Sequence, residues 1–444
     1  MRGKRAQASL SLAYRRYALA VMTAVYTLNF VDRGLVMLLL EPIKRDLALS
    51  DSQLGFLTGI AFGLFYAVLG LPLARWADRG NRVTITSLAI GLWGVTVMGT
   101  LYVASFSQML LARVAAAVGE AGCKPPTYSL LGDYFPGSAE RTRAMAIYMT
   151  GGLSSTLVSF VAGGYLNELY GWRMAFFLMG IPGLLIALLV RLTIVEPRID
   201  ARLSSPAREQ PPLRAVLLML WRQRSCRHLC IALIWLYTMS LGLGPWYAAF
   251  MIRSHDMTTS DLGLWLGLIF GLGGIAGVLL GGYVTTRWFA NDERGQVRVS
   301  AATVATLVPC FLAFLTVPGK YQALVTLIPL IVVFSFFLGP TYALMQRLVA
   351  DEMRATTMAV VMLLANLIGM GVGPQVVGLL SDALVPVAGI DSLRYAMVAM
   401  SGVALLSAFH FWRVGSTVRE DLANVMTPAL ASARDERRSA VEAV

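Results

Sequence analysis

Residues 52–64 read SQLGFLTGIAFGL, and residues 260–272 read SDLGLWLGLIFGL. The two stretches share seven residues in one register, namely Ser52, Leu54, Gly55, Gly59, Phe62, Gly63 and Leu64 in the first copy and Ser260, Leu262, Gly263, Gly267, Phe270, Gly271 and Leu272 in the second. Each stretch opens an apolar run, and glycine inside such a run lets helix backbones approach closely in lipid. The repeat therefore predicts a chain of two related helical halves.

Two further pairs of motifs repeat in the same order. Pro126-Thr127-Tyr128 returns as Pro340-Thr341-Tyr342, and Arg141, Met145 and Ala146 return as Arg354, Met358 and Ala359. Glycines and leucines recur by chance in membrane helices, but three ordered registers make coincidence a poor explanation. We therefore expect a pseudo-twofold protein whose halves rock about a site between them.

The composition is typical of a membrane protein. Of the 444 residues, 57% are hydrophobic and 14% are charged, whereas a soluble domain carries about 25% charged residues. The apolar residues form blocks of about 20, the length that a helix needs to cross the hydrocarbon core. We identify twelve spans, at residues 17–40, 51–74, 83–104, 107–131, 143–166, 172–194, 228–250, 261–286, 299–317, 321–346, 356–380 and 393–413. The expected fold class is an all-α membrane protein with twelve transmembrane helices in two pseudo-symmetric six-helix bundles.

The basic residues set the expected orientation. The net charge is +12, yet Lys and Arg fall in short segments between apolar blocks, which argues against a nucleic-acid partner. The positive-inside rule places both termini in the cytoplasm of a multi-pass inner-membrane protein, which we expect to be a monomer surrounded by membrane lipids. The expected segments are a basic N-terminus (1–16), an N-terminal bundle (17–194), a cytoplasmic linker (195–227), a C-terminal bundle (228–413) and a cytoplasmic tail (414–444).

This layout of two six-span halves joined by a long linker resembles the major facilitator superfamily. The loop Ala74-Arg75-Trp76-Ala77-Asp78-Arg79-Gly80-Asn81-Arg82 is similar to the superfamily's signature between its second and third helices, although Asn81 stands where a basic residue is more usual. The resemblance implies that Asp78, Arg79 and Arg82 form a cytoplasmic gate. These arginines can also serve as topology determinants, and both roles can hold at once.

Five charged residues lie well inside the apolar spans, and these are Asp32, Arg33, Arg113, Glu120 and Lys124. An ionisable residue in the membrane is a functional candidate because its burial is costly. Asp32 lies roughly 12 Å and Arg113 roughly 9 Å below the outer ends of their spans, so the two can face each other. Asp32 with Arg113 or Arg33, and Glu120 with Lys124 one turn later, can be inert ion pairs. Alternatively, the two acids carry protons.

Three motifs resemble the Spinster family of lipid transporters. They are Asn29-Phe30-Val31-Asp32-Arg33, Arg113 before Gly119-Glu120-Ala121, and Gly132-Asp133-Tyr134-Phe135 followed by Arg141-Thr142-Arg143. The resemblance implies that Asp32 and Glu120 are proton-coupling acids, with Arg33 as their partner and Arg113 as the motif base. It places Asp133, Arg141 and Arg143 with the cytoplasmic gate, and it implies sphingolipid or lysophospholipid-like substrates. Lys124 departs from the small polar residue expected there.

The carboxy-terminal half has no charge well inside its spans. Its expected cavity residues are Trp246, Tyr247, Tyr342, Gln346, Asn366 and Gln375, with Phe334, Phe336 and Phe337, and the amino-terminal half adds Asn29 and Tyr128. A charged half facing an aromatic half suits an amphiphile. Each aromatic residue can equally be ordinary packing.

The leading hypothesis is a proton-coupled exporter of lysophospholipid or sphingolipid-like amphiphiles that works by alternating access. A multidrug or small-solute proton antiporter of the same fold is the alternative, weakened because the fifth span lacks the glycine-proline antiporter signature. A membrane-embedded enzyme has little support, since no Ser or Cys nucleophile has a base nearby in sequence. Cys226, His228 and Cys230 lack a full ligand set for a metal ion, and we expect no cofactor other than protons.

Overall fold

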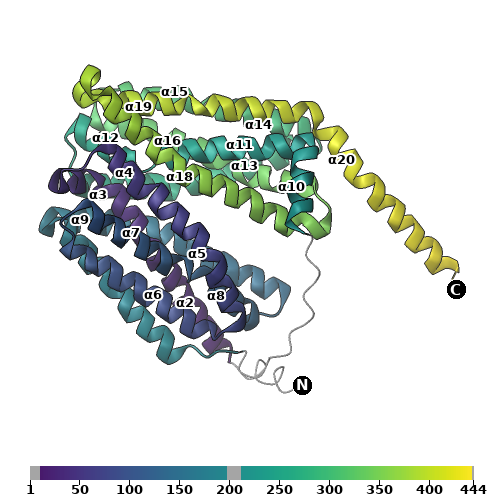
Figure 1. The fold of residues 1–444 in the computed structure, drawn as a ribbon. Coiled ribbons are helices and arrows are strands. Elements are labelled where there is room, and N and C mark those ends of the chain that lie inside the picture. Colours follow the sequence, from purple (N-terminus) through teal and green to yellow (C-terminus); the bar gives the residue numbers. More distant parts are fainter. Residues whose placement is uncertain (1–10, 198–211, 443–444) are drawn as a thin grey trace.

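The computed structural model describes residues 11–197 and 212–442, and these ranges fold into helices without strands (Figure 1). The amino-terminal half consists of α2 (Leu12–Asn29), α3 (Val31–Leu47), α4 (Asp51–Thr58), α5 (Ile60–Arg79), α6 (Arg82–Gly99), η1 (Thr100–Tyr102), α7 (Phe106–Ala121), α8 (Lys124–Tyr134) and α9 (Ser138–Thr193). The carboxy-terminal half consists of α10 (Leu213–Arg222), α11 (Arg224–Leu243), α12 (Trp246–His255), α13 (Thr259–Trp288), α14 (Glu293–Ala305), α15 (Leu307–Thr316), α16 (Lys320–Phe336), α17 (Leu338–Arg347), η2 (Asp351–Met353), α18 (Arg354–Ala388), η3 (Gly389–Asp391), α19 (Ser392–Ser401) and α20 (Val403–Glu442).

These helices are consistent with the twelve predicted spans. Within the described ranges, nine helical stretches are long and apolar enough to cross a membrane. Two of the nine each contain two predicted spans, because α9 turns at Gly171 with φ of 80° and the stretch from Thr356 runs through η3. The fourth predicted span is not among the nine because it is divided into α7 and α8, which are only 16 and 11 residues long.

Several spans are broken near their middle. The first breaks at Phe30, between α2 and α3, and the second at Gly59, between α4 and α5. The fourth breaks at Gly122 and Cys123. Broken helices in a membrane are tolerated where they line a cavity or are buried in protein. The breaks place Asp32, Arg33 and Lys124 in the first turns of new helices.

The repeated glycine stretches form the contact between the two halves. A Cβ atom on Gly55 of α4 would lie 2.5 Å from the carbonyl oxygen of Pro374 in α18. A Cβ atom on Gly263 of α13 would lie 2.1 Å from the carbonyl oxygen of Phe160 in α9. Both distances are far below van der Waals contact, so only glycine permits these helices to pack so closely. The repeat that identified the two halves is thus also the surface that joins them.

The halves meet at one end of the molecule, which we name the closed end and define by Glu41, Asp51 and Arg253. In Figure 1 this end holds α3, α4 and α12, and the two halves diverge towards the opposite end, where α8 and α10 lie. The packing of α12 on α3 and of α4 on α18 covers the closed end.

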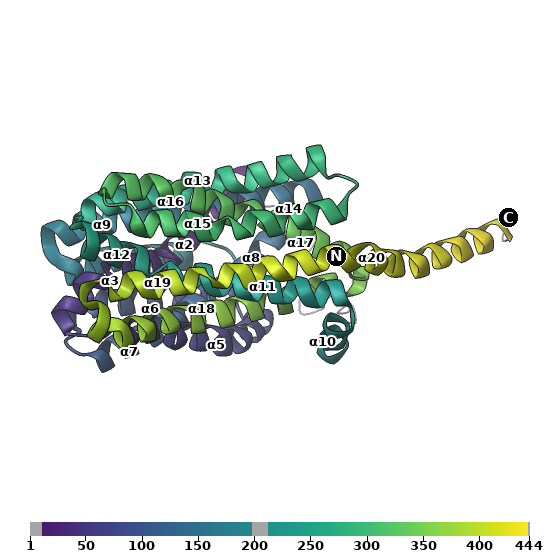
Figure 2. The ribbon, with the colours of Figure 1, turned by 90° about the horizontal axis from the view of Figure 1, so that it is seen from above.

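The linker and the tail contain more helix than their composition predicts. Residues 198–211 of the expected linker lie outside the described ranges, but α10 follows them and buries Val216 and Leu220. The last predicted span does not end at residue 413. It continues as α20, with Val414, Val418 and Leu422 buried, and the helix extends beyond the bundle (Figure 2). Local composition does not reveal these contacts because they depend on which helices lie alongside.

Candidate functional site

A cavity of about 320 Å³ lies between the two halves. On the amino-terminal side it is lined by α3, α4, α5 and α7, and its charged lining residues are Arg33 and Arg113. On the carboxy-terminal side the wall comes from α11, α12, α13, α16 and α18 and is mainly apolar, as with Leu241, Leu330 and Phe334. The cavity therefore offers cations on one wall and hydrocarbon or aromatic surface on the other.

Asp32 and Arg113 form a buried ion pair beside this cavity. One terminal nitrogen of Arg113 lies 2.6 Å from Asp32 Oδ2, and Trp93 donates its indole N–H to Asp32 Oδ1 at 3.0 Å. Arg113 also lies 4.6 Å from the centre of the Phe62 ring. The depth estimate from the sequence allowed this pairing, and the structure brings the two side chains together.

Glu120 pairs with Arg33 instead of with Lys124. Arg33 donates from Nε to Glu120 Oε2 at 2.9 Å and makes a second bond from Nη2 to Oε1, so the pair is bidentate. Glu120 is 0% exposed, whereas the Arg33 side chain is 24% exposed and lines the cavity. Arg33 also donates to the sulfur of Met370 in the other half at 3.5 Å. It thus links the sealed acid to the cavity and to the opposite bundle.

Lys124 has no carboxylate within ion-pair distance in the part of the chain that the structure describes. Its ammonium lies 4.1 Å from the centre of the Phe30 ring and 5.5 Å from that of Tyr26. The expected one-turn pairing with Glu120 is wrong because the break at Gly122 and Cys123 interrupts the helix between the two residues. The spacing rule for residues four apart holds only within a continuous helix.

The predicted cavity residues separate into two groups. Tyr247 and Phe334 line the cavity. The others do not: Tyr128 and Gln346 are exposed elsewhere, Asn366 is half-buried, Tyr342 is half-buried and hydrogen-bonds Tyr237, and Phe336 and Phe337 are packed in the core. Gln375 is half-buried, with no partner for its carbonyl oxygen among the described residues. Asn29 and Trp246 are not among the residues that line this cavity, and both are fully buried. The neighbouring residues Gly244 and Pro245 line the cavity in place of Trp246.

The expected gate residues lie at the end opposite the closed end. Arg82 is fully buried and binds Glu196, with its backbone N–H 2.7 Å from Glu196 Oε2, and it lies 2.7 Å from Asp133 Oδ2. Arg141 donates to the carbonyl oxygens of Phe135 and Gly132 at the end of α8. These contacts join helices of one half.

Arg143 is exposed in this cluster, and the side chains of Asp78 and Arg79 lie outside the described part of the structure. Sequence reasoning missed Glu196, which follows the sixth span directly.

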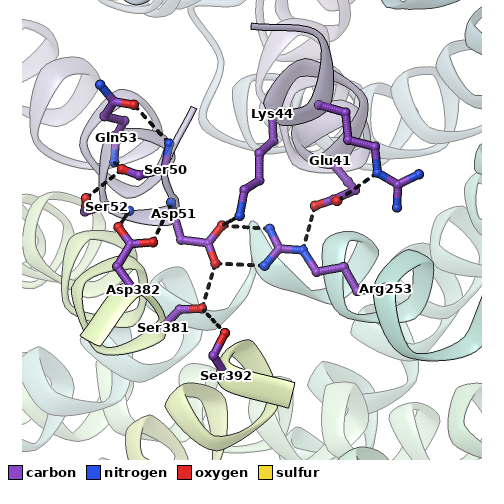
Figure 3. Close-up of polar contacts among 11 residues, drawn as sticks. Glu41, Lys44, Ser50, Asp51, Ser52, Gln53, Arg253, Ser381, Asp382 and Ser392 are labelled. Atoms are coloured by element: carbon purple, nitrogen blue, oxygen red, sulfur yellow. Dashed lines mark hydrogen bonds and ion pairs between the residues drawn. The ribbon is translucent and has the colours of Figure 1, made fainter. Parts of the chain in front are cut away.

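The charged residues that join the two halves were also missed, and Figure 3 shows them at the closed end. Arg253 of α12 binds both oxygens of Asp51 at 2.7 Å and Glu41 at 2.6 Å. Lys44 and Ser381 also donate to Asp51, each at 2.6 Å. We call Glu41, Lys44, Asp51, Arg253 and Ser381 the closed-end network.

A carboxylate from one half also caps a helix of the other. Asp382 of α18 accepts the backbone N–H groups of Asp51 at 3.0 Å and Ser52 at 2.8 Å (Figure 3). Carboxylates favour helix N-termini because of the free N–H groups and the helix dipole. For these contacts between the halves, the only signal in the sequence was a set of charged residues at the ends of spans. Such charges are explained equally well by their role in setting the membrane topology.

Asp51→Asn should open the closed end. The neutral amide leaves Arg253 with one carboxylate, and breaking a buried pair of this kind costs about 3–5 kcal/mol. A cysteine placed in the cavity by Met37→Cys should then react faster with an impermeant maleimide added from the closed end. Asp46→Asn is the matched control, because Asp46 pairs at the same end with Arg173 of its own half. Equal labelling rates in the two variants would contradict this role of the network.

Comparisons with known proteins agree with this architecture. The family model described as Major Facilitator Superfamily matches residues 22–374. The chain is 31% identical over 410 residues to an MFS-type efflux pump of Mycolicibacterium smegmatis, covering 91% of this chain and 94% of that protein. It is 27% identical over 403 residues to protein spinster homolog 1 of Mus musculus, covering 84% and 74% of the two chains.

A solved structure has the same arrangement of helices. It is the crystal structure of a bacterial homologue of the human lysosomal transporter Spinster in an inward-facing, unoccupied conformation. The TM-score is 0.81 at 28% identity, covering 93% of this chain and 99% of that one. The chain therefore belongs to the Major Facilitator Superfamily, and it is a multi-pass membrane transporter, not an enzyme, that resembles the Spinster proteins.

Proposed function

We propose that this transporter couples proton movement to the transport of an acidic amphiphile, of lysophospholipid or sphingolipid-like type. The observation that carries the proposal is the ion pair between the sealed Glu120 and the cavity-lining Arg33. A substrate that enters the cavity can reach the arginine but not the acid. The substrate and the proton are therefore linked through Arg33.

The linkage has a defined sign. An acidic head group that binds Arg33 draws it away from Glu120, which then holds an uncompensated charge in a low-dielectric site. Such a charge is costly, so the acid takes up a proton instead. An acidic substrate and a proton consequently bind together and cross together as the halves rock.

The shape of the cavity supports an amphiphile as the cargo. Its two arginines lie on one wall, and Leu241, Leu330 and Phe334 lie on the wall opposite. An acyl chain can contact the apolar wall while its head group meets the cations. Spinster proteins, with which this chain shares its fold, include a relative described as a lysosomal transporter.

Efflux of a cationic solute is the second candidate, and the 31% identical efflux pump favours it. A cation would compete with Arg33 for Glu120 and would also compete with the proton. This opposite linkage gives antiport, in which protons that enter the cell drive export of the solute. The sign of the proton effect therefore separates the two candidates.

The orientation is part of the proposal. Both termini lie in the cytoplasm of a bacterial inner membrane, as the distribution of basic residues indicates. The closed end then faces outward, and the structure represents an inward-facing state of a monomer. No cofactor other than the proton takes part.

Proton uptake on binding tests the proposal directly. Addition of lysophosphatidylglycerol to the purified transporter in weakly buffered detergent solution should take up protons, as a pH-indicator dye will report. Ethidium should bind weakly and without proton uptake. Proton release on ethidium binding, with no response to the lysolipid, would instead establish the antiport candidate and overturn the acidic amphiphile.

A further inference from the structure

The charges inside the membrane do not balance. Among the five charged residues well inside the predicted spans, three are cations and two are carboxylates. Asp32 pairs with Arg113, and Glu120 pairs with Arg33. Lys124 is the cation that remains without a carboxylate within the described ranges, and the cluster carries one net positive charge.

The position of Lys124 adds to the electrostatic cost of holding its positive charge inside the membrane. It is the first residue of α8, where the partial charge of the helix end is also positive. Its ammonium is held against the rings of Phe30 at 4.1 Å and Tyr26 at 5.5 Å. Such cation–π contacts supply about 0.5–2 kcal/mol. They orient the ammonium but do not replace a carboxylate at ion-pair distance.

Lys124 and Arg33 contact the same ring. The guanidinium of Arg33 lies 4.7 Å from the centre of Phe30, and the ammonium of Lys124 lies 4.1 Å from it. Lys124, Phe30 and Tyr26 are all half-buried, whereas Glu120 is sealed. A ligand beside Phe30 can therefore meet both cations before it meets either acid.

We propose that Lys124 binds the acidic group of the transported substrate, a phosphate or a carboxylate, next to Arg33. The inference rests on the proposed function and names the residue that selects an acidic head group. Lys124 supplies the charge that attracts the anion, and Arg33 transmits its arrival to Glu120. Phe30 lies against both cations and holds the ammonium close to Arg33 when no substrate is bound.

Equilibrium binding to the full chain in lipid nanodiscs tests this role with three probes. Lysophosphatidylglycerol has an acidic head and an acyl chain, lysophosphatidylcholine has the same chain on a zwitterionic head, and gluconate has an acidic group without a chain. Lys124→Gln should weaken binding of lysophosphatidylglycerol on the order of ten- to hundredfold, as loss of a charged hydrogen bond predicts. Binding of lysophosphatidylcholine should change much less, and Lys124→Arg should restore most of the selectivity.

Lys320→Gln is the matched control. Lys320 also lies over an aromatic ring, 5.2 Å from the centre of Tyr321, but it is at the start of α16 and shares no ring with Arg33. The Lys320→Gln variant should bind both lysolipids as the wild type does. A purely structural role for Lys124 would reduce binding of both lysolipids equally, and that result, or no change at all, would overturn the inference.

The probes also separate this inference from the proposed function. One outcome is that the wild type binds gluconate but neither lysolipid, and that Lys124→Gln abolishes the binding of gluconate. Lys124 then binds an acidic group, as inferred here, but the proposal of an amphiphilic substrate fails. If lysolipid binds with proton uptake and Lys124→Gln leaves the selectivity unchanged, the proposed function holds and this inference fails. If the wild type binds none of the three, both fail.

Discussion

Glu120→Gln should abolish accumulation of substrate driven by a pH gradient while leaving exchange of substrate across the membrane intact. Glutamine keeps the size of the side chain and can accept a hydrogen bond from Arg33, but it cannot gain or lose a proton. The substrate can still bind and the halves can still rock, so labelled lysolipid should exchange with unlabelled lysolipid at equal pH. Uphill transport requires the proton and should fall at least a hundredfold, comparable to loss of about 3 kcal/mol of coupling free energy.

Proteoliposomes containing a fluorescent lysophosphatidylglycerol provide the measurement, with albumin added to extract the lipid from the outer leaflet. Glu140→Gln is the control, because Glu140 forms an exposed ion pair with Arg15, remote from the cavity. The Glu140→Gln variant should accumulate lysolipid as the wild type does. Full gradient-driven accumulation by Glu120→Gln would show that another group carries the proton.

The sequence predicted the two halves and twelve spans with which the observed helices are consistent, because both depend on features that can be recognised along the chain. Apolar runs of sufficient length mark membrane helices wherever they occur. The repeat around Gly55 and Gly263 can be recognised because the two halves keep identical residues there. The pairing of Asp32 with Arg113 was also accessible, since depth in the membrane follows from rise per residue. These predictions required no knowledge of which helices touch.

The partners of Glu120 could not be predicted in the same way. The spacing of Glu120 and Lys124 indicates a pair on a continuous helix, but the helix breaks at Gly122 and Cys123. Pro125 and Pro126 follow this point directly and are the signal that could have marked the break, because proline has no N–H to continue the hydrogen bonds of α7. With Lys124 displaced onto Phe30, the acid takes Arg33 from α3 as its partner.

The closed-end network was inaccessible for a different reason. Asp51 and Arg253 stand at the ends of spans, where charges are common and usually only set topology. Their contact also depends on the conformation, because the two halves meet at this end only when it is closed. A single sequence specifies all the states of a transporter at once, so it does not indicate which charges pair in any one of them.

Gly263→Ala should shift the transporter away from the state seen here. The added methyl group would lie 2.1 Å from the carbonyl oxygen of Phe160 and 3.0 Å from its carbon, both backbone atoms of α9 that cannot rotate aside. The helices α13 and α9 must therefore separate at the closed end. Overpacking of this kind destabilises a structure by about 1–3 kcal/mol. Here it destabilises only the conformation in which the closed end is closed.

Gly271→Ala is the control on the same helix and in the same repeat, because nothing lies within 4 Å of a Cβ atom at Gly271. Spin labels at Leu169→Cys in α9 and Val387→Cys in α18, both exposed positions, should report the separation of the halves. The distance distribution of Gly263→Ala should gain a longer component that Gly271→Ala lacks. About 1–3 kcal/mol corresponds to a shift of about 5- to 150-fold between the two states. Identical distributions would mean that the closed end is not held by close approach of α13 and α9, and that the closed-end network and the contact of α4 with α18 suffice to hold it.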